Sequence, residues 1–287
     1  MRITKQAILE YGQLLAQENT DHPYGRVFIY QQFRFFFTVN GNRYSPADLT
    51  DSDADGMPDY IIHLLQKLLV AYAILVEALG FRDLFTGGIF HAQGARYIDV
   101  FLDDIAVEHG IASATVFLIE PAILQDTKFI GKSLRLILHR GLQASTATPM
   151  HELVHLFQFS YVPYNNMWFM EGVARWGQRL MQTGNGKMEA LPATQTELEA
   201  LLRKWHDAEF FWNRLAALCR YRADFPLPES LMSCEVPVNT QWTDGVFMRV
   251  FLQQCENNVA QMLKEQSSRE LPDHGNWNRE EKRSANN

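Results

Sequence analysis

The chain places its strand-forming stretches before most of its helix-forming stretches, and this order limits the folds open to it. Four stretches with aromatic, β-branched or alternating apolar residues predict strands: 26–39, 96–104, 113–119 and 133–140. In the last of these, alternation places Arg135 and Ile137 on one face and three leucines on the other, Leu134, Leu136 and Leu138. This pattern indicates a strand with one buried face.

Helical periodicity predominates in the second half of the chain. Apolar spacing predicts helices at 149–159 and 167–182, followed by further helical pattern, and two helices nearer the N-terminus at 3–18 and 60–79. We therefore expect an α+β fold, with a mixed or antiparallel sheet in the N-terminal half and a mostly helical C-terminal half. The expected divisions are an N-terminal helix, an α/β subdomain, a helical subdomain and a disordered tail, at 1–25, 26–160, 161–263 and 264–287.

The most apolar segment, 61–81, predicts a buried amphipathic helix. Four polar residues interrupt it: His63, Gln66, Lys67 and Glu77. The uninterrupted run 68–76 is too short to cross a bilayer, so we expect no membrane span. The first twenty residues show no apolar core and no cleavage site of a secretion signal, which leaves the location open.

Charge and cysteine content exclude further classes of protein. A net charge of −7 argues against a nucleic-acid binder, which needs an excess of Lys and Arg to neutralise phosphates. The cysteines are Cys219, Cys234 and Cys255, none of them in a CxxC pair, which argues against a zinc ribbon. Their odd number argues against a disulfide scaffold. A bridge between Cys219 and Cys234 is an alternative, but buried free thiols are the expectation.

The stretch "TPMHELVHLFQFSY" (148–161) contains the residues of a zinc site. His151 and His155 are four residues apart, which places both imidazoles on one face of a helix. Two such nitrogens can hold one Zn²⁺, and Glu152 occupies the position of a general base. The alternative is a core helix with structural histidines.

A catalytic zinc site needs a third protein ligand, and Glu171 is the best candidate. Fifteen residues separate it from His155, enough for a loop to reverse the chain and for a second helix to return. Gly172 is expected to let the two helices approach closely. Trp168 and Trp176 flank Glu171 and are expected to form apolar walls of the site. Patterns with a third histidine soon after the pair, or with the inverted order HxxEH, are not present in the sequence.

A second acidic motif, "DSDADGMPDYI", resembles a calcium loop. Oxygen ligands at alternate positions, a glycine at the sixth position and a carbonyl at the seventh give these candidate calcium residues: Asp51, Asp53, Asp55, Met57 and Asp59. Ile62 stands where an EF-hand has glutamate, so the motif is not an EF-hand. The alternative is a solvated acidic turn at the start of the following helix.

Four motifs together resemble one family. "DSDADGMPDYI", "RYIDVFL", "HELVHLFQ" and "WFMEGVARW" occur in the order and spacing seen in a group of largely exported bacterial metalloproteases, within the gluzincin superfamily of zinc peptidases. The resemblance covers roughly residues 30–260. It implies a zincin-like fold, zinc ligation by His151, His155 and Glu171, Glu152 as base, and an extracellular location. It also implies that the strand before the active-site helix, 133–140, is an edge that pairs with a peptide substrate.

The chain departs from the superfamily at Arg175, where thermolysin-like enzymes have an aspartate that orients a histidine. Another group must then orient the imidazoles. The residue that stabilises the oxyanion is also open among four candidates: Tyr161, Tyr164, His206 and Tyr221.

The expected function is zinc-dependent hydrolysis of peptide bonds, with a peptide or protein as substrate and Ca²⁺ as a further structural ion. One alternative is a binding protein that is stabilised by zinc and calcium and has no turnover. Another is a secreted effector protease that acts inside a target cell. Oligomeric state and cleavage specificity are not given by the sequence.

Overall fold

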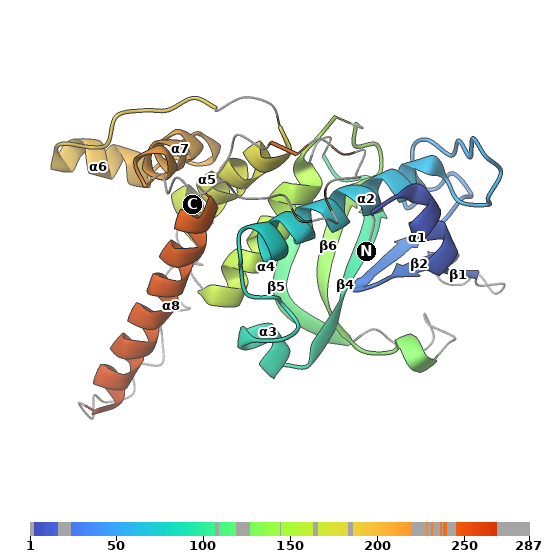
Figure 1. The fold of residues 1–287 in the computed structure, drawn as a ribbon, viewed down its shortest axis with the longest axis horizontal. Coiled ribbons are helices and arrows are strands. Elements are labelled where there is room, and N and C mark those ends of the chain that lie inside the picture. Colours follow the sequence, from blue (N-terminus) through green and yellow to red (C-terminus); the bar gives the residue numbers. More distant parts are fainter. Residues whose placement is uncertain are drawn as a thin grey trace, which may run out of the picture.

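The protein folds around one six-stranded sheet with helices packed mainly on one of its faces, as the computed structural model shows (Figure 1). It describes residues 3–16, 24–106, 109–118, 127–143, 145–162, 166–182, 186–219, 228, 231, 236, 238–239 and 245–268. The expected α+β class and mixed sheet are confirmed.

The sheet has the order β1-β2-β3-β4-β6-β5. Its strands are β1 (Gln13–Ala16), β2 (Arg26–Tyr30), β3 (Phe33–Phe37), β4 (Ala95–Asp103), β5 (Gly110–Leu118) and β6 (Lys132–His139). The first three are antiparallel neighbours, β4 runs parallel to both β3 and β6, and β5 is antiparallel to β6. Since β6 lies between β4 and β5, the expectation that 133–140 is an edge strand was wrong. The edge is β5, which folds back along β6.

The described residues form eight α-helices: α1 (Lys5–Tyr11), α2 (Asp59–Ala73), α3 (Gly88–Ala92), α4 (Thr148–Tyr161), α5 (Met167–Gln178), α6 (Gln195–Leu202), α7 (Glu209–Leu218) and α8 (Gly245–Ser268). A π-helical turn, Ile74–Ala78, continues α2. Three 3₁₀ turns occur elsewhere in the described residues: Thr127–Phe129, Arg179–Met181 and His206–Ala208. The expected strands and the helices at 60–79, 149–159 and 167–182 are thus confirmed within a few residues at each end.

The main core lies between the sheet and helices α2 and α4. The predicted alternation in β6 is confirmed, because its three leucines are fully buried in this core while Arg135 and Ile137 face the other side. Helices α2 and α4 pack on each other and on this same face. The sheet therefore fixes the position of α4, which carries the two histidines.

The N-terminal stretch 3–18 does not form the single predicted helix. Helix α1 ends at Tyr11, and β1 begins at Gln13. Gly12 lies against Phe28, where an added Cβ would be only 2.2 Å from the ring. Only glycine fits this close approach. The chain leaves the helix at Gly12 and pairs with β2, although Leu14 also fits a helical period.

Helix α2 with its π-helical turn, Asp59–Ala78, is long and apolar enough to cross a membrane, by length and composition alone. In the fold it is a core helix, and 78% of its most apolar window is buried inside the protein. A buried core helix of a soluble protein passes the same test, so this helix is weak evidence for a membrane span.

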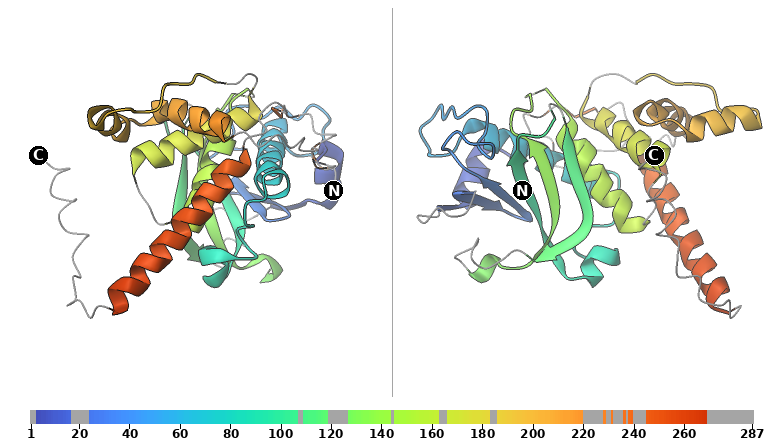
Figure 2. Two further views of the ribbon diagram at one scale, coloured as in Figure 1. Left: turned by 60° about the vertical axis from the view of Figure 1, so that its left-hand side comes forward. Right: turned by 180° about the vertical axis from the view of Figure 1, so that it is seen from behind.

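The C-terminal half is helical, as expected, and α8 projects away from the body of the protein (Figure 2). Met248 and Leu252 bury its first turns in the core. The helix continues through Ser268, into the segment 264–287 that the sequence predicts to be disordered; 269–287 lie outside the described residues.

Two of the three cysteines lie in the described part of the chain. Cys255 is half-buried and Cys219 is exposed, and both are free thiols. The expectation that the free thiols are buried was therefore wrong for Cys219, which lies just after the last turn of α7. Cys234 lies outside the described residues.

Candidate metal centre

The two histidines of α4 lie side by side, as their spacing predicts. Their Nε2 atoms are 3.1 Å apart, and both residues are buried, with 7% of their surface exposed. Pro149 stands in the first turn of α4, where its missing N–H costs no hydrogen bond. The side chains of His151 and His155 thus converge on one point at the wall of a cavity.

Glu171 on α5 reaches the same point. Its Oε2 is 3.2 Å from Nε2 of His151, and its Oε1 is 3.6 Å from Nε2 of His155. Ligands of a tetrahedral zinc at 2.0–2.2 Å are separated from one another by about 3.3–3.6 Å. The three side chains therefore stand at separations close to those of zinc ligands. Asn166 fixes the start of α5 by accepting a hydrogen bond from the backbone N–H of Trp168.

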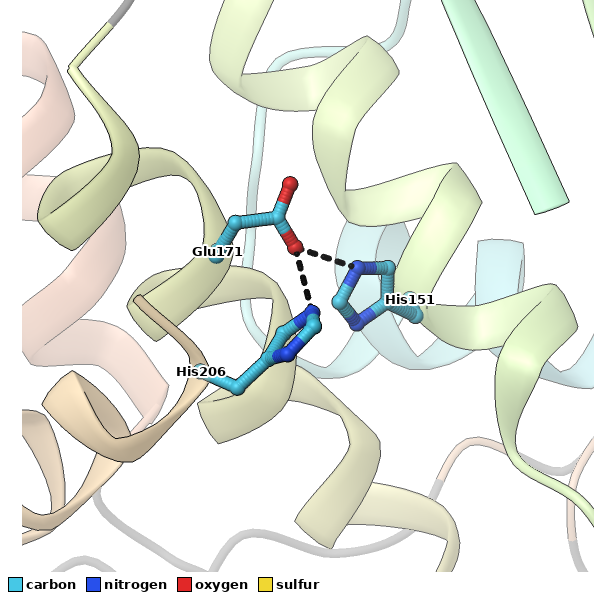
Figure 3. Close-up of side chains that lie close together, drawn as sticks. All are labelled: His151, Glu171 and His206. Carbon is cyan, nitrogen blue, oxygen red and sulfur yellow. Dashed lines mark hydrogen bonds and ion pairs between the residues drawn. The ribbon is translucent and has the colours of Figure 1, made fainter. Parts of the chain in front are cut away.

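His206 also belongs to this cluster, and Figure 3 shows its ring directed at the carboxylate of Glu171. Its Nε2 is 3.0 Å from Oε2 of Glu171. Ligand atoms of His151, Glu171 and His206 all lie within 4.8 Å of one another, so this set also satisfies the spacing of a metal site. The sequence placed His206 only among the candidates for oxyanion stabilisation. It comes from a 3₁₀ turn before α7, which reaches the site by tertiary packing against α5.

The other oxyanion candidates do not reach the centre or lie outside the described residues. Tyr161 is buried, and its hydroxyl accepts a hydrogen bond from the backbone N–H of Arg82 at 2.8 Å. It does not line the cavity, so it acts as a packing residue. Tyr164 and Tyr221 are among the residues that the structure does not describe.

Glu152 lies on the β5 side of the cluster. It is buried, its carboxylate accepts a hydrogen bond from the backbone of Ala112, and an added Cβ on Gly110 would be 2.4 Å from its Cγ. Burial, and next the charge of Glu171, raise the pKa of Glu152 to about 8. Without a bound metal, the carboxyl group is therefore mostly protonated at pH 7.

The charge states of the other groups fit metal ligation. Burial, and next the charge of His151, lower the pKa of His155 to about 4. Burial acts to raise the pKa of Glu171, but the hydrogen bond from His151 and the nearby imidazoles outweigh it, and the pKa lies at about 2. Near neutral pH, His155 is a neutral donor and Glu171 is a carboxylate, as metal binding requires.

Gln158 orients His155. The Nδ1 atom of His155 lies 3.0 Å from Oε1 of Gln158, whose amide nitrogen donates to the carbonyl of Phe169 at 3.2 Å. Gln158 therefore supplies the orienting contact, which the sequence left open, for one of the two histidines. The motif "HExxHxxQ" contained the signal, since Gln158 is three residues after His155 on the same helix face. Nδ1 of His151 is buried, without a partner among the described residues.

Arg175 takes no part in orienting the imidazoles. Its Nη1 donates to Oε1 of Gln178 at 2.9 Å, and its Nε lies 3.4 Å from Oε2 of Glu209. Arg175 thus contacts Gln178 and Glu209 rather than an imidazole.

A cavity of about 630 Å³ opens over the centre, with the edge strand β5 on one side and α5 on the other. The two tryptophans expected as its walls do not line it. Trp176 is fully buried in the core, and Trp168 stacks on Trp212 with ring centroids 5.2 Å apart. Trp205, beside His206, lines the cavity instead.

Two glycines of α5, Gly172 and Gly177, lie where α5 closely approaches a neighbouring helical segment, whereas the sequence predicted this only for Gly172. Gly172 faces Ala208 and Trp212 rather than α4, because an added Cβ would be 2.8 Å from each of these side chains. Gly177 is the glycine that admits Val154 of α4, at 2.6 Å from an added Cβ. The expectation that Gly172 lets α4 and α5 approach was therefore wrong.

The aspartate loop is folded around a lysine. Carboxylate oxygens of Asp51, Asp53 and Asp55 lie within 4.8 Å of one another. The ammonium of Lys5, on α1, is 2.8 Å from Asp53 and 2.6 Å from Asp59.

Asp51 and Asp55 also accept hydrogen bonds from the backbone of the loop itself. Asp51 accepts hydrogen bonds from the backbone N–H groups of Asp55 and Gly56. Met57 is buried in the core, and its N–H donates to Asp55. Gly56 has a φ of +86°, as the sharp turn requires.

Comparison of the chain with protein-family models, with curated proteins and with solved structures gives no match.

Proposed function

We propose that this protein is a zinc-dependent peptidase in which His151, His155 and Glu171 hold the metal and Glu152 is the general base. The observation that carries the proposal is the convergence of three side chains from two helices, with nitrogen and oxygen atoms 3.1–3.6 Å apart, beside a buried carboxyl group. Zinc bound there would supply the Lewis acidity that activates water and polarises a carbonyl group.

The residues of this chain divide the remaining work. Glu152 accepts a proton from the attacking water and returns it to the leaving amine, as its buried position beside the proposed ligands allows. His206 is 52% exposed on the open side of the cluster and can donate a hydrogen bond to the carbonyl oxygen as negative charge develops on it.

Substrate binding is assigned to the edge strand β5. Gly110, Ile111 and Ala112 line the cavity, and their outer edge faces none of the described strands of the sheet. An extended peptide can add to such an edge through main-chain hydrogen bonds. This arrangement would lay a peptide carbonyl across the cavity between β5 and α5. This arrangement supports a zincin-like architecture in which β5 pairs with substrate, instead of β6 as the sequence predicted.

The test combines metal content with turnover. The purified full-length chain is analysed for zinc and incubated with unfolded casein, alongside Glu152→Gln and the control Glu199→Gln, an exposed glutamate of α6. We expect near-stoichiometric zinc in all three proteins, and cleavage by wild type and the control only. Zinc retention without cleavage by wild type would favour a binding protein. Equal cleavage by Glu152→Gln would remove the proposed base, and loss of zinc binding would not be expected from that substitution.

A further inference from the structure

We propose that Arg175 forms a carboxylate-binding subsite in the cavity, so that the enzyme prefers peptides with an acidic group close to the cleaved bond. The inference rests on the proposed peptidase function and adds its substrate class. The acidic group is an Asp or Glu side chain or the peptide's own C-terminal carboxylate, since both present the same anion.

Arg175 is the only arginine or lysine among the described residues that line the cavity. Its side chain is 43% exposed, although its helix is mostly buried. The cavity's two acidic residues, Glu152 and Glu171, already have roles as base and ligand. A fixed positive charge that faces the cavity therefore has no assigned partner within it.

The surroundings of Arg175 hold the guanidinium in place without neutralising it. Glu209 is buried and lies between two arginines, with Nε of Arg175 3.4 Å from one oxygen and Nη2 of Arg179 2.5 Å from the other. One carboxylate shared by two guanidinium groups leaves one positive charge in excess. The hydrogen bond from Nη1 to Gln178 fixes the plane of the group.

One edge of the guanidinium remains available. The contacts above use Nε and one hydrogen of Nη1, and Nη2 of Arg175 has no hydrogen-bond partner among the described residues. A carboxylate can accept two parallel hydrogen bonds from such an edge, an arrangement that arginine provides and lysine does not.

The position along α5 limits where the acidic group lies in the substrate. Arg175 follows Glu171 by four residues, so it lies about 6 Å, slightly more than one helical turn, further along the axis. An extended peptide advances about 3.3 Å per residue. The acidic group is therefore expected within about two residues of the cleaved bond.

The experiment first maps cleavage sites in unfolded casein by mass spectrometry, for wild type, Arg175→Gln and Arg214→Gln. Arg214, an exposed arginine of α7, is the matched control, because its substitution removes the same charge but it neither lines the cavity nor pairs with Glu209. Matched peptides built on the preferred site then carry Glu or Gln at the indicated position. Each peptide is made with a free and with an amidated C-terminus, which separates the two sources of carboxylate.

We expect wild type to cleave the preferred acidic peptide with about tenfold or greater kcat/KM than its neutral match, the range for a hydrogen bond to a charged group. Arg175→Gln is expected to lose this ratio, Arg214→Gln to keep it, and Arg175→Lys to keep part of it. No acidic preference in wild type, or the same preference in Arg175→Gln, would overturn the inference while leaving the peptidase proposal intact.

A binding measurement separates the two proposals if wild type cleaves nothing. That outcome contradicts the peptidase function. Fluorescence anisotropy of the same labelled acidic and neutral peptides then tests the subsite on full-length wild type and Arg175→Gln. Tighter binding of an acidic peptide by wild type alone supports the subsite, and equal binding of all peptides overturns it.

Discussion

The side-chain amide of Gln158 fixes the protonation of His155. Its nitrogen donates to the carbonyl of Phe169, and a carbonyl can only accept, so the oxygen of the amide must face Nδ1 of His155. Nδ1 therefore carries the proton, and Nε2 presents its lone pair toward His151 and Glu171. A backbone carbonyl on α5 thus determines which nitrogen on α4 is available to a metal.

Gln158→Leu is expected to lower zinc affinity about 10- to 100-fold, the usual effect of losing a partner that orients a metal-binding histidine. Because Gln158 is fully buried and hydrogen-bonds to both His155 and Phe169, the substitution is also expected to lower stability by about 1–3 kcal/mol through the loss of these two hydrogen bonds. Competition with a chromogenic chelator measures the affinity. Gln158→Glu, which keeps an acceptor at Nδ1, should bind zinc more tightly than the leucine variant; equal affinities would show that the contact does not matter.

His206→Asn is expected to lower kcat about 10²- to 10³-fold, the cost of removing one hydrogen-bond donor from an oxyanion, with little change in zinc content. The side chain is half-exposed, so the thermal midpoint should stay within a degree or two of wild type. Metal analysis of the same sample decides between two roles. Loss of zinc together with activity would make His206 a ligand, as its place beside His151 and Glu171 also allows.

Local patterns predicted most elements and the core of the site, because these depend on neighbours in sequence. The spacing of His151 and His155 and the return of a second helix with Glu171 follow from helix period and loop length. His206 has no such signal. The packing of α7 on α5 brings it to the site, through contacts such as Ala208 and Trp212 against Gly172.

The same limit explains the errors in the sheet. Leu14 and Leu15 fit both a helix and a strand, and pairing with β2 decides the outcome. Likewise β5 and β6 are both strand-like in sequence, but which of them is the edge depends on how they pair, and β6 is held on both sides. The predictions were therefore reliable where the sequence of a single helix or strand determines its structure. They failed where the outcome depends on which other element it packs or pairs with.

Lys5 is expected to compete with calcium for the aspartate loop. Its ammonium lies among Asp53, Asp55 and Asp59, and the pKa of Asp59 falls to about 2 chiefly through its hydrogen bond with Lys5. Lys5→Gln should raise calcium affinity and increase the rise in melting temperature that calcium produces, because the loop then lacks its internal cation. The measurement is a thermal scan with calcium or with chelator. No calcium-dependent shift in either protein would mean that the loop is an acidic turn neutralised by lysine.

Glu152 should make the metal-free protein less stable as pH rises from about 6.5 to 8. The folded chain keeps this proton up to a pKa of about 8, while the unfolded chain loses it near 4.5, so ionisation favours unfolding across that interval. His155, whose pKa falls from 6.5 to about 4, gives the opposite slope, but only below 6.5. Between pH 6.5 and 8 the Glu152 effect amounts to at most about 2 kcal/mol. Lys67, whose pKa burial lowers to about 8, gives the opposite slope chiefly above this interval. Urea unfolding of metal-free wild type and Glu152→Gln measures this effect. The free energy of unfolding of the glutamine variant should rise steadily relative to that of wild type as pH increases through this interval. A difference between the two proteins that stays constant with pH would contradict the buried, protonated carboxyl group.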